Sequence, residues 1–96
     1  MNKIIPDNAF APPLKYRFTF VLKGMTYSEG ITYQISDKIC DRVRAFRIAL
    51  EVFYTEHDYN RRLPFAVFYG DVESPDSKDQ LYCTLFFDSY VIGGLD

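Results

Sequence analysis

One histidine, two cysteines and a short acidic stretch are the residues with which this chain could do chemistry. A cysteine nucleophile needs a histidine within hydrogen-bond reach. Cys40 and His57 lie 17 residues apart on one predicted helix, about 25 Å at 1.5 Å per residue, so that pair is excluded. Cys83 can still reach His57, but no local motif marks the pair. A histidine near a helix C-terminus is favourable without any catalytic role.

The acidic stretch contains Glu73, Asp76 and Asp79 around Pro75. General acid–base catalysis needs paired carboxyls in a pocket that shifts their pKa values, and a loop does not provide one. The chain also lacks CxxC, GxGxxG, GxxxxGK[ST], GxSxG and calcium-loop patterns. We therefore expect no enzyme, no catalytic residue, no metal and no cofactor. Buried, inert thiols are the default for the two cysteines, and a disulfide between them stays open.

The balance of charge and aromatic residues is the informative part of the composition. The 96 residues carry a net charge of −2, and 18% of them are aromatic, nine Phe and eight Tyr without Trp. Residues 1–64 carry ten Lys/Arg against seven Asp/Glu, and residues 65–96 carry one against six. This split allows pairing with itself or with a charged protein partner. The run Ile4-Ile5 is broken at once, so we expect a cytoplasmic protein with no membrane contact.

The first third of the chain predicts an arm and a hairpin. Residues 1–14 should form an extended N-terminal arm, because three prolines deny backbone donors there. Residues 15–23 and 31–36 alternate apolar with polar side chains, which is typical of half-buried strands. These two strands should pair as an antiparallel hairpin.

A helix and two further strands are predicted to follow. Ser36 or Asp37 should cap a helix that runs to about His57. The apolar stripe of this helix comprises Ile39, Val43, Phe46, Leu50 and Phe53. Ile48 lies roughly on the opposite side of the helix. Residues 65–72 and 81–88, with an extension toward residue 92, should be strands. The predicted fold class is α+β: a two-layer ββαββ domain over residues 15–92, with one helix packed on one face of a four-stranded antiparallel sheet and a flexible tail at 93–96.

The last two strands are apolar on both faces, although one helix can cover only one face of a sheet. The second face could be covered by the arm, by a second copy or by another protein. We hypothesise that part of it stays open for a partner. The expected partner-binding residues are aromatic, with Phe68, Tyr82 and Phe86 at the centre and Tyr69 and Tyr90 at the rim.

Three function classes follow from these patterns. We predict a small non-enzymatic protein-binding module, such as an inhibitor or accessory factor of the type that phages and mobile elements carry, docking on a larger host protein. The alternative is a nucleic-acid-binding protein that uses sheet aromatics with Arg17, Arg44 and Arg47. It is the weaker reading, because the arginines form no single stripe and the aromatic strands lie in the acidic half. The third class is a structural subunit, and we expect a homodimer in any of the three.

Overall fold

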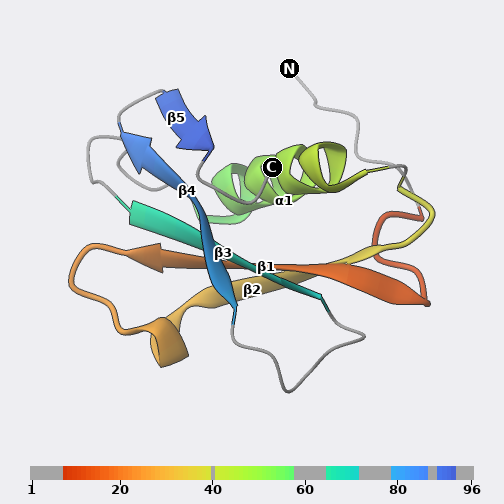
Figure 1. Cartoon of the computed structure of the whole chain (residues 1–96), viewed down its shortest axis with the longest axis horizontal. Coiled ribbons are helices and arrows are strands. Elements are labelled where there is room, and N and C mark those ends of the chain that lie inside the picture. Colours follow the sequence, from red (N-terminus) through yellow and green to blue (C-terminus); the bar gives the residue numbers. More distant parts are fainter. Residues whose placement is uncertain (1–7, 40, 58–64, 72–78, 87–88, 93–96) are drawn as a thin grey trace.

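The computed structural model describes residues 8–39, 41–57, 65–71, 79–86 and 89–92. The predicted tail at 93–96, residues 1–7 of the arm, most of the acidic stretch and Cys40 lie outside the described residues. In chain order the elements are β1 (Leu14–Leu22), the short 3-10 helix η1 (Tyr27–Glu29), β2 (Ile31–Ser36), α1 (Arg42–His57), β3 (Phe65–Asp71), β4 (Gln80–Phe86) and β5 (Ser89–Ile92) (Figure 1).

The sheet has the strand order β2-β1-β3-β4-β5, and every neighbouring pair is antiparallel. Helix α1 connects β2 to β3 and covers one face (Figure 1). The predicted antiparallel sheet with one helix is confirmed. It gains β5, which pairs antiparallel with β4 and places Ser89 opposite Phe86. The fourth strand, expected over 81–88 with an extension toward residue 92, is therefore two strands.

The core lies between the sheet and α1 and is rich in aromatic rings that contact one another. Alternation in β1 directs Phe18 and Phe20 toward the helix, where both are fully buried. The Phe20 ring stacks on Phe53 of α1 with centroids 4.7 Å apart. Phe18 meets Phe46 of the same helix at 5.7 Å. Most of the aromatic side chains in the first half of the chain are therefore buried in the core of the domain.

The helix begins several residues later than the sequence predicts. Its first turn is capped by Asp41, whose Oδ1 accepts a hydrogen bond from the Arg44 amide at 2.8 Å. Ser36 instead ends β2, and its Oγ accepts the Lys38 amide at 3.1 Å in a local turn. The expected cap at Ser36 or Asp37 is therefore wrong, because the Ser36 side chain closes a turn between strand and helix.

The buried side of α1 also differs from the predicted stripe. Ile48, expected opposite the core, is only 8% exposed. Val43 and Leu50, expected at the centre of the stripe, are half-buried. Ala45 and Ala49 are fully buried, and such small side chains let a helix approach its neighbours closely. The buried face therefore turns roughly a quarter turn about the helix axis, at 3.6 residues per turn.

The described part of the arm runs past the connection between β2 and α1. Ala9 is fully buried, and its carbonyl accepts a hydrogen bond from the Ser36 amide at 2.6 Å. The Pro13 carbonyl accepts one from the Asp37 amide at 3.1 Å. Residues 8–13 are thus tied to the end of β2 rather than laid across the sheet face opposite α1.

Candidate functional site

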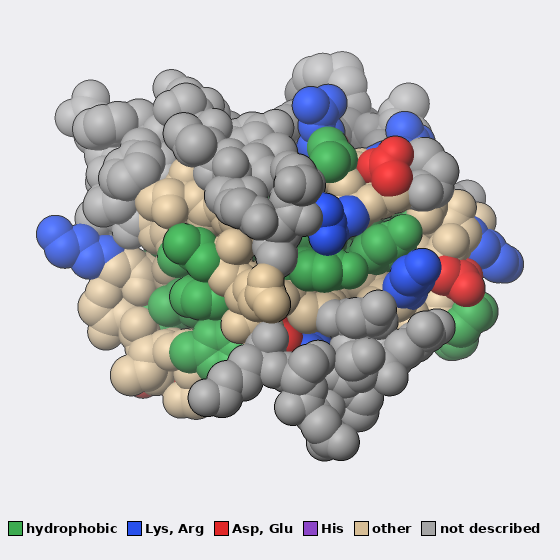
Figure 2. Space-filling view, in the orientation of Figure 1, with side chains coloured by type: hydrophobic (Ala, Val, Ile, Leu, Met, Phe, Trp, Pro, Cys, Tyr) green, Lys and Arg blue, Asp and Glu red, His purple; other side chains and the backbone are tan. Residues whose placement is uncertain are grey.

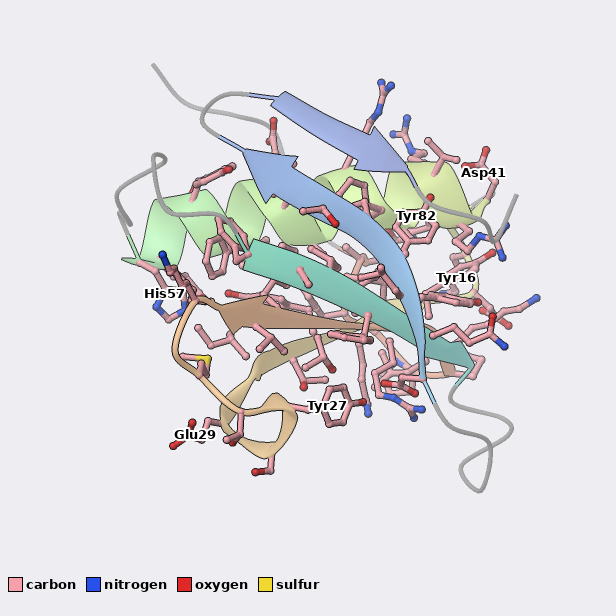
Figure 3. The ribbon with its side chains drawn as sticks, turned by 60° about the vertical axis from the view of Figure 1, so that its left-hand side comes forward. Tyr16, Tyr27, Glu29, Asp41, His57 and Tyr82 are labelled. Atoms are coloured by element: carbon pink, nitrogen blue, oxygen red, sulfur yellow. The ribbon has the colours of Figure 1, made fainter. Side chains whose placement is uncertain are left out.

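A β-bulge in β4 decides which aromatic side chains reach the sheet face opposite α1. Val67 pairs with Cys83, but the next residue, Phe68, pairs with Leu81, so Tyr82 is the extra residue. A bulge re-aims side chains because two residues oppose one on the partner strand. Tyr82 consequently joins Cys83 on the helix side, where it is fully buried (Figure 3).

The expectation that Tyr82 anchors a partner at the surface is therefore wrong. Its ring lies 5.1 Å from the Phe46 ring and 5.6 Å from the Phe18 ring, inside the core. Strict alternation along 81–86 would have put it on the other face with Thr84. The bulge carries no signal in the sequence of β4, which reads QLYCTLF.

Tyr69 also lies on the helix side, because it pairs with Phe18 and its ring is 5.2 Å from the Phe18 ring. The Arg42 guanidinium covers it at 5.3 Å, in cation–π geometry, and lies 5.8 Å from the Tyr82 ring. Tyr69 is half-buried there and does not share a face with Phe68. The side chains of the other two predicted residues, Phe86 and Tyr90, lie outside the described part of the chain.

The sheet face opposite α1, called the open face below, keeps one predicted aromatic residue and gains two apolar ones. Phe68 is half-buried on this face, in register with Leu81. Tyr27 from η1 packs on Phe68 edge-on, with ring centroids 5.3 Å apart. Leu81 is 47% exposed and Tyr27 is 48% exposed. Sequence analysis missed both, since the bulge hides the orientation of Leu81 and Tyr27 lies in a turn region.

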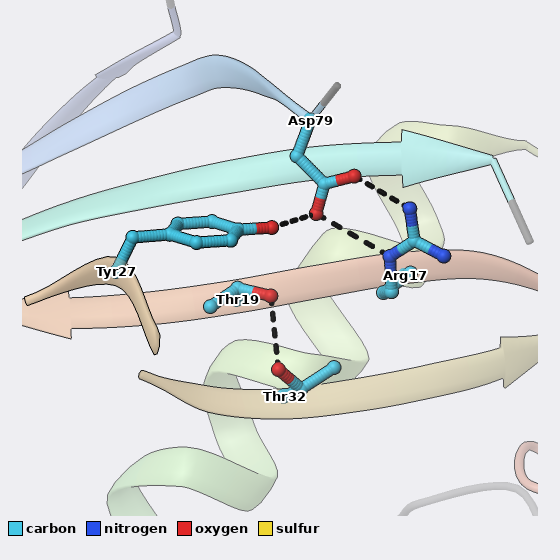
Figure 4. Close-up of polar contacts among 5 residues, drawn as sticks. All are labelled: Arg17, Thr19, Tyr27, Thr32 and Asp79. Carbon is cyan, nitrogen blue, oxygen red and sulfur yellow. Dashed lines mark hydrogen bonds and ion pairs between the residues drawn. The ribbon is translucent and has the colours of Figure 1, made fainter. Parts of the chain in front are cut away.

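A polar cluster beside this apolar patch holds Tyr27 in place (Figure 4). Arg17 donates two hydrogen bonds to Asp79, from Nη2 to Oδ1 at 2.5 Å and from Nε to Oδ2 at 3.3 Å. The hydroxyl of Tyr27 donates to Asp79 Oδ2. The Asp79 side chain is 3% exposed and that of Arg17 is 18% exposed. A charged pair of this bidentate form has a well-defined geometry, so the cluster fixes η1 against the sheet.

Gly70 is the residue that makes room for this cluster. A Cβ at this position would lie 1.9 Å from Asp79 Oδ1 and 2.4 Å from Arg17 Nη2. Both atoms belong to the ion pair itself. A side chain at residue 70 would therefore separate the pair, and the requirement for glycine here is steric.

The cluster sets the protonation of its own members. Burial by itself would raise the pKa of Asp79, but hydrogen bonds from Arg17 and Tyr27 and the charge of Arg17 together lower it below its usual value. Burial, the hydrogen bond to Asp79 and the carboxylate charge raise the pKa of Tyr27. At neutral pH Asp79 is thus an ionised acceptor and Tyr27 a protonated donor, which is the state that the geometry requires.

The three arginines named for nucleic-acid contact are not brought together. Arg17 lies on the open face and is paired with Asp79. Arg44 and Arg47 are exposed on α1, across the sheet from it. Phosphate binding needs positive charges that converge on one surface, and these residues do not form one.

The groups with nucleophilic or ligating chemistry are buried or separated. Cys83 is a free thiol, 1% exposed, and burial raises its pKa to about 12. His57 packs against Phe53 at 5.3 Å, and its Nε2 lies 3.8 Å from Glu56 Oε1. Within the described ranges no group of three His, Cys, Asp or Glu side chains could hold a metal ion. The helix in this part of the chain is not long and apolar enough to span a membrane.

The Cys83 thiol should therefore be unreactive in the folded protein. In a Cys40→Ser background, Ellman's reagent at pH 8 should label Cys83 roughly a hundredfold or more slowly than a small free thiol, because thiolate is scarce and access is blocked. Labelling should become fast in denaturant. Rapid labelling under native conditions would show that β4 opens readily or that the thiol is not buried.

Family models, curated proteins and solved structures were each compared with this chain, and none of them matches it.

Proposed function

We propose that the chain is a small, non-enzymatic protein-binding module that docks on a larger protein through its open face. The observation that carries this proposal is the apolar patch of Phe68, Leu81 and Tyr27, of which the last two are close to half exposed. Large apolar side chains gathered on a surface are the usual anchors of protein interfaces. Figure 2 shows hydrophobic side chains in several separate groups on one side of the molecule, some of them beside Lys and Arg side chains.

Rigidity of the patch supports the same proposal. Tyr27 is held both by its contact with Phe68 and by its hydrogen bond to Asp79. Binding through side chains that are already ordered costs little conformational entropy. A partner that covers Leu81 and Tyr27 would also desolvate the Arg17–Asp79 pair, which is already satisfied internally, so burying it leaves no unpaired charge.

The mode of action proposed here is steric. A rigid face presented by a domain of this size would occlude the surface of a larger protein, as an inhibitor or accessory factor does. This mechanism needs no proton transfer or bound metal. It requires only that the patch remain accessible when the domain is folded.

Substitution of Leu81 tests the proposal. Leu81→Arg should leave folding intact, because close to half of the residue is exposed to solvent, and should weaken partner capture about tenfold or more by placing a charge in the patch. Phe10→Arg is the matched control, since Phe10 is 43% exposed and belongs to the arm, which is bonded to the end of β2. Tagged wild-type protein and both variants would be incubated with lysate, and retained proteins quantified by mass spectrometry.

The proposal predicts one set of proteins that wild type and Phe10→Arg retain and Leu81→Arg loses. Identical retention by all three proteins would reject the open face as the docking surface. Loss with Phe10→Arg alone would move the contact to the arm.

A further inference from the structure

Strand β2 forms one edge of the sheet, and its own sequence carries none of the residues that usually protect an edge strand. The strand order leaves one side of β2 without a neighbouring strand among the described residues. Its sequence, ITYQIS, contains no charged residue, no proline and no glycine. Natural sheets normally block such edges with lysine, proline or a bulge, because an open edge pairs with another chain. The pairing between β1 and β2 has one irregularity, between Leu14 and Tyr16, and it lies opposite the last two residues of β2.

The backbone groups that face outward from β2 can be assigned from one end. The Ser36 amide donates to Ala9 rather than to β1, so it points away from the sheet. Backbone direction alternates along a strand, so Thr32 and Gln34 point the same way. The hydroxyl contact between Thr19 and Thr32, at 2.9 Å, fits this assignment, because side chains approach most closely at non-hydrogen-bonded pairs. Within the described ranges no other backbone group bonds to the outward side of Thr32 or Gln34.

We propose that β2 pairs antiparallel with β2 of a second copy of this chain, about a two-fold axis at Tyr33. Thr32 of each copy would then lie opposite Gln34 of the other and exchange two backbone hydrogen bonds with it, giving four in all. Ala9 already occupies the outward amide of Ser36, so the open stretch is centred on Tyr33. A second copy can occupy this stretch because β2 is complementary to itself about Tyr33, as an isologous two-fold contact requires.

Side chains along this register are compatible with the pairing. The two Tyr33 rings would form a cross-strand aromatic pair, a favourable combination at a non-hydrogen-bonded position. The hydroxyl of Tyr33 is held by Glu56 Oε1 at 3.0 Å, which orients the ring. No charged residue of one β2 would face a like charge of the other, and the nearest charges, Glu29, Asp37 and Lys38, lie outside the strand.

This dimer is independent of the proposed docking function, because edge pairing leaves the open face of each sheet uncovered. A contact made by one short strand buries less surface than a standard interface, so the dimer should be weak. We expect a concentration-dependent equilibrium between monomer and dimer rather than a permanent assembly.

Introducing a charge at Gln34 tests the register. Across the two-fold axis the two Gln34 side chains would be diagonal neighbours, about 7–8 Å apart on the same face. Purified wild-type protein should show a mass that rises with concentration in sedimentation equilibrium up to about 1 mM, whereas Gln34→Lys and Gln34→Glu alone should remain closer to monomer. A mixture of the two variants should regain the dimer, because opposite charges then meet. The same substitutions at Thr55, which is exposed on α1, are the controls and should dimerise like wild type.

Amide hydrogen exchange of the unmodified protein provides a second test that does not depend on the variants folding. The Thr32 and Gln34 amides should exchange quickly in dilute solution and more slowly as concentration rises. A wild-type protein that stays monomeric, or variants that dimerise like wild type, would overturn the proposal. Protection of these amides that is independent of concentration would show that the chain's own N-terminal residues cover the edge of β2. That result would also overturn the proposed dimer.

Discussion

Replacing Phe20 with alanine is expected to lower the free energy of unfolding by about 3–5 kcal/mol. Phe20 is fully buried, and its ring stacks on Phe53 at 4.7 Å and meets Tyr33 edge-on at 5.7 Å. One side chain thus joins β1 to both α1 and β2. Truncation removes these contacts and leaves a cavity that the surrounding aromatic rings cannot easily fill. Domains of this kind have a total stability of only about 5–15 kcal/mol, so a large part would be lost.

Phe10→Ala is the matched control for this substitution. It deletes the same atoms from a side chain that is 43% exposed, so it should change stability by about 0.5 kcal/mol or less. Urea denaturation followed by circular dichroism measures both variants against wild type. Equal losses from the two substitutions would contradict the assignment of Phe20 to the centre of the core.

Removing Arg17 should produce the second large effect, a loss of about 2–3 kcal/mol in Arg17→Met. The Asp79 side chain is only 3% exposed, so the substitution would leave a buried carboxylate that keeps the hydrogen bond from Tyr27 but loses the guanidinium. A double-mutant cycle with Asp79→Asn isolates the interaction. The double variant should lose clearly less stability than the sum of the two single variants, with a coupling of about 1–3 kcal/mol. Additive losses would show that the pair contributes nothing as a pair.

The same pair gives a dependence of stability on pH with a defined sign. The folded-state pKa of Asp79 is lowered, so its contribution is fully present above the unfolded-state pKa of about 4 and disappears as pH falls through the folded-state pKa. The difference in stability between wild type and Asp79→Asn should therefore be constant from pH 5 to 7 and shrink below about pH 4. A difference that grows on acidification would contradict the lowered pKa.

These stability tests bear on the proposed function because the polar cluster supports the docking patch. Arg17→Met should loosen η1 and with it Tyr27, whereas Leu81→Arg alters the patch without disturbing the cluster. Partner capture should consequently fall with both, but only Arg17→Met should lower the free energy of unfolding. This difference between the two variants distinguishes Leu81, which would contact the partner, from Arg17, which positions a contacting residue.

Much of the architecture follows from local patterns in the sequence. The period of two in residues 15–23 and 31–36 specifies one buried face, because only every second side chain of a strand can point inward. The helical periodicity of residues 39–53 and the proline at 64 indicate a single helix. The sequence placed its start at Ser36 or Asp37, whereas the helix begins at Arg42. Two such strand pairs and one helix can bury their apolar faces only against each other, so the α+β class needs no knowledge of distant contacts.

The location of the exposed patch required the tertiary structure. The bulge between β3 and β4 is a property of their pairing, so nothing in β4 alone indicates that Tyr82 turns inward while Leu81 faces out. The cluster of Arg17, Tyr27 and Asp79 joins residues up to 62 positions apart, and the absence of a side chain at Gly70 acquires meaning only when these residues meet. The sequence determined the α+β class and the order of the first strands and the helix. Strand register and long-range packing decided which apolar side chains remain at the surface, because burial depends on neighbours that the local sequence does not contain.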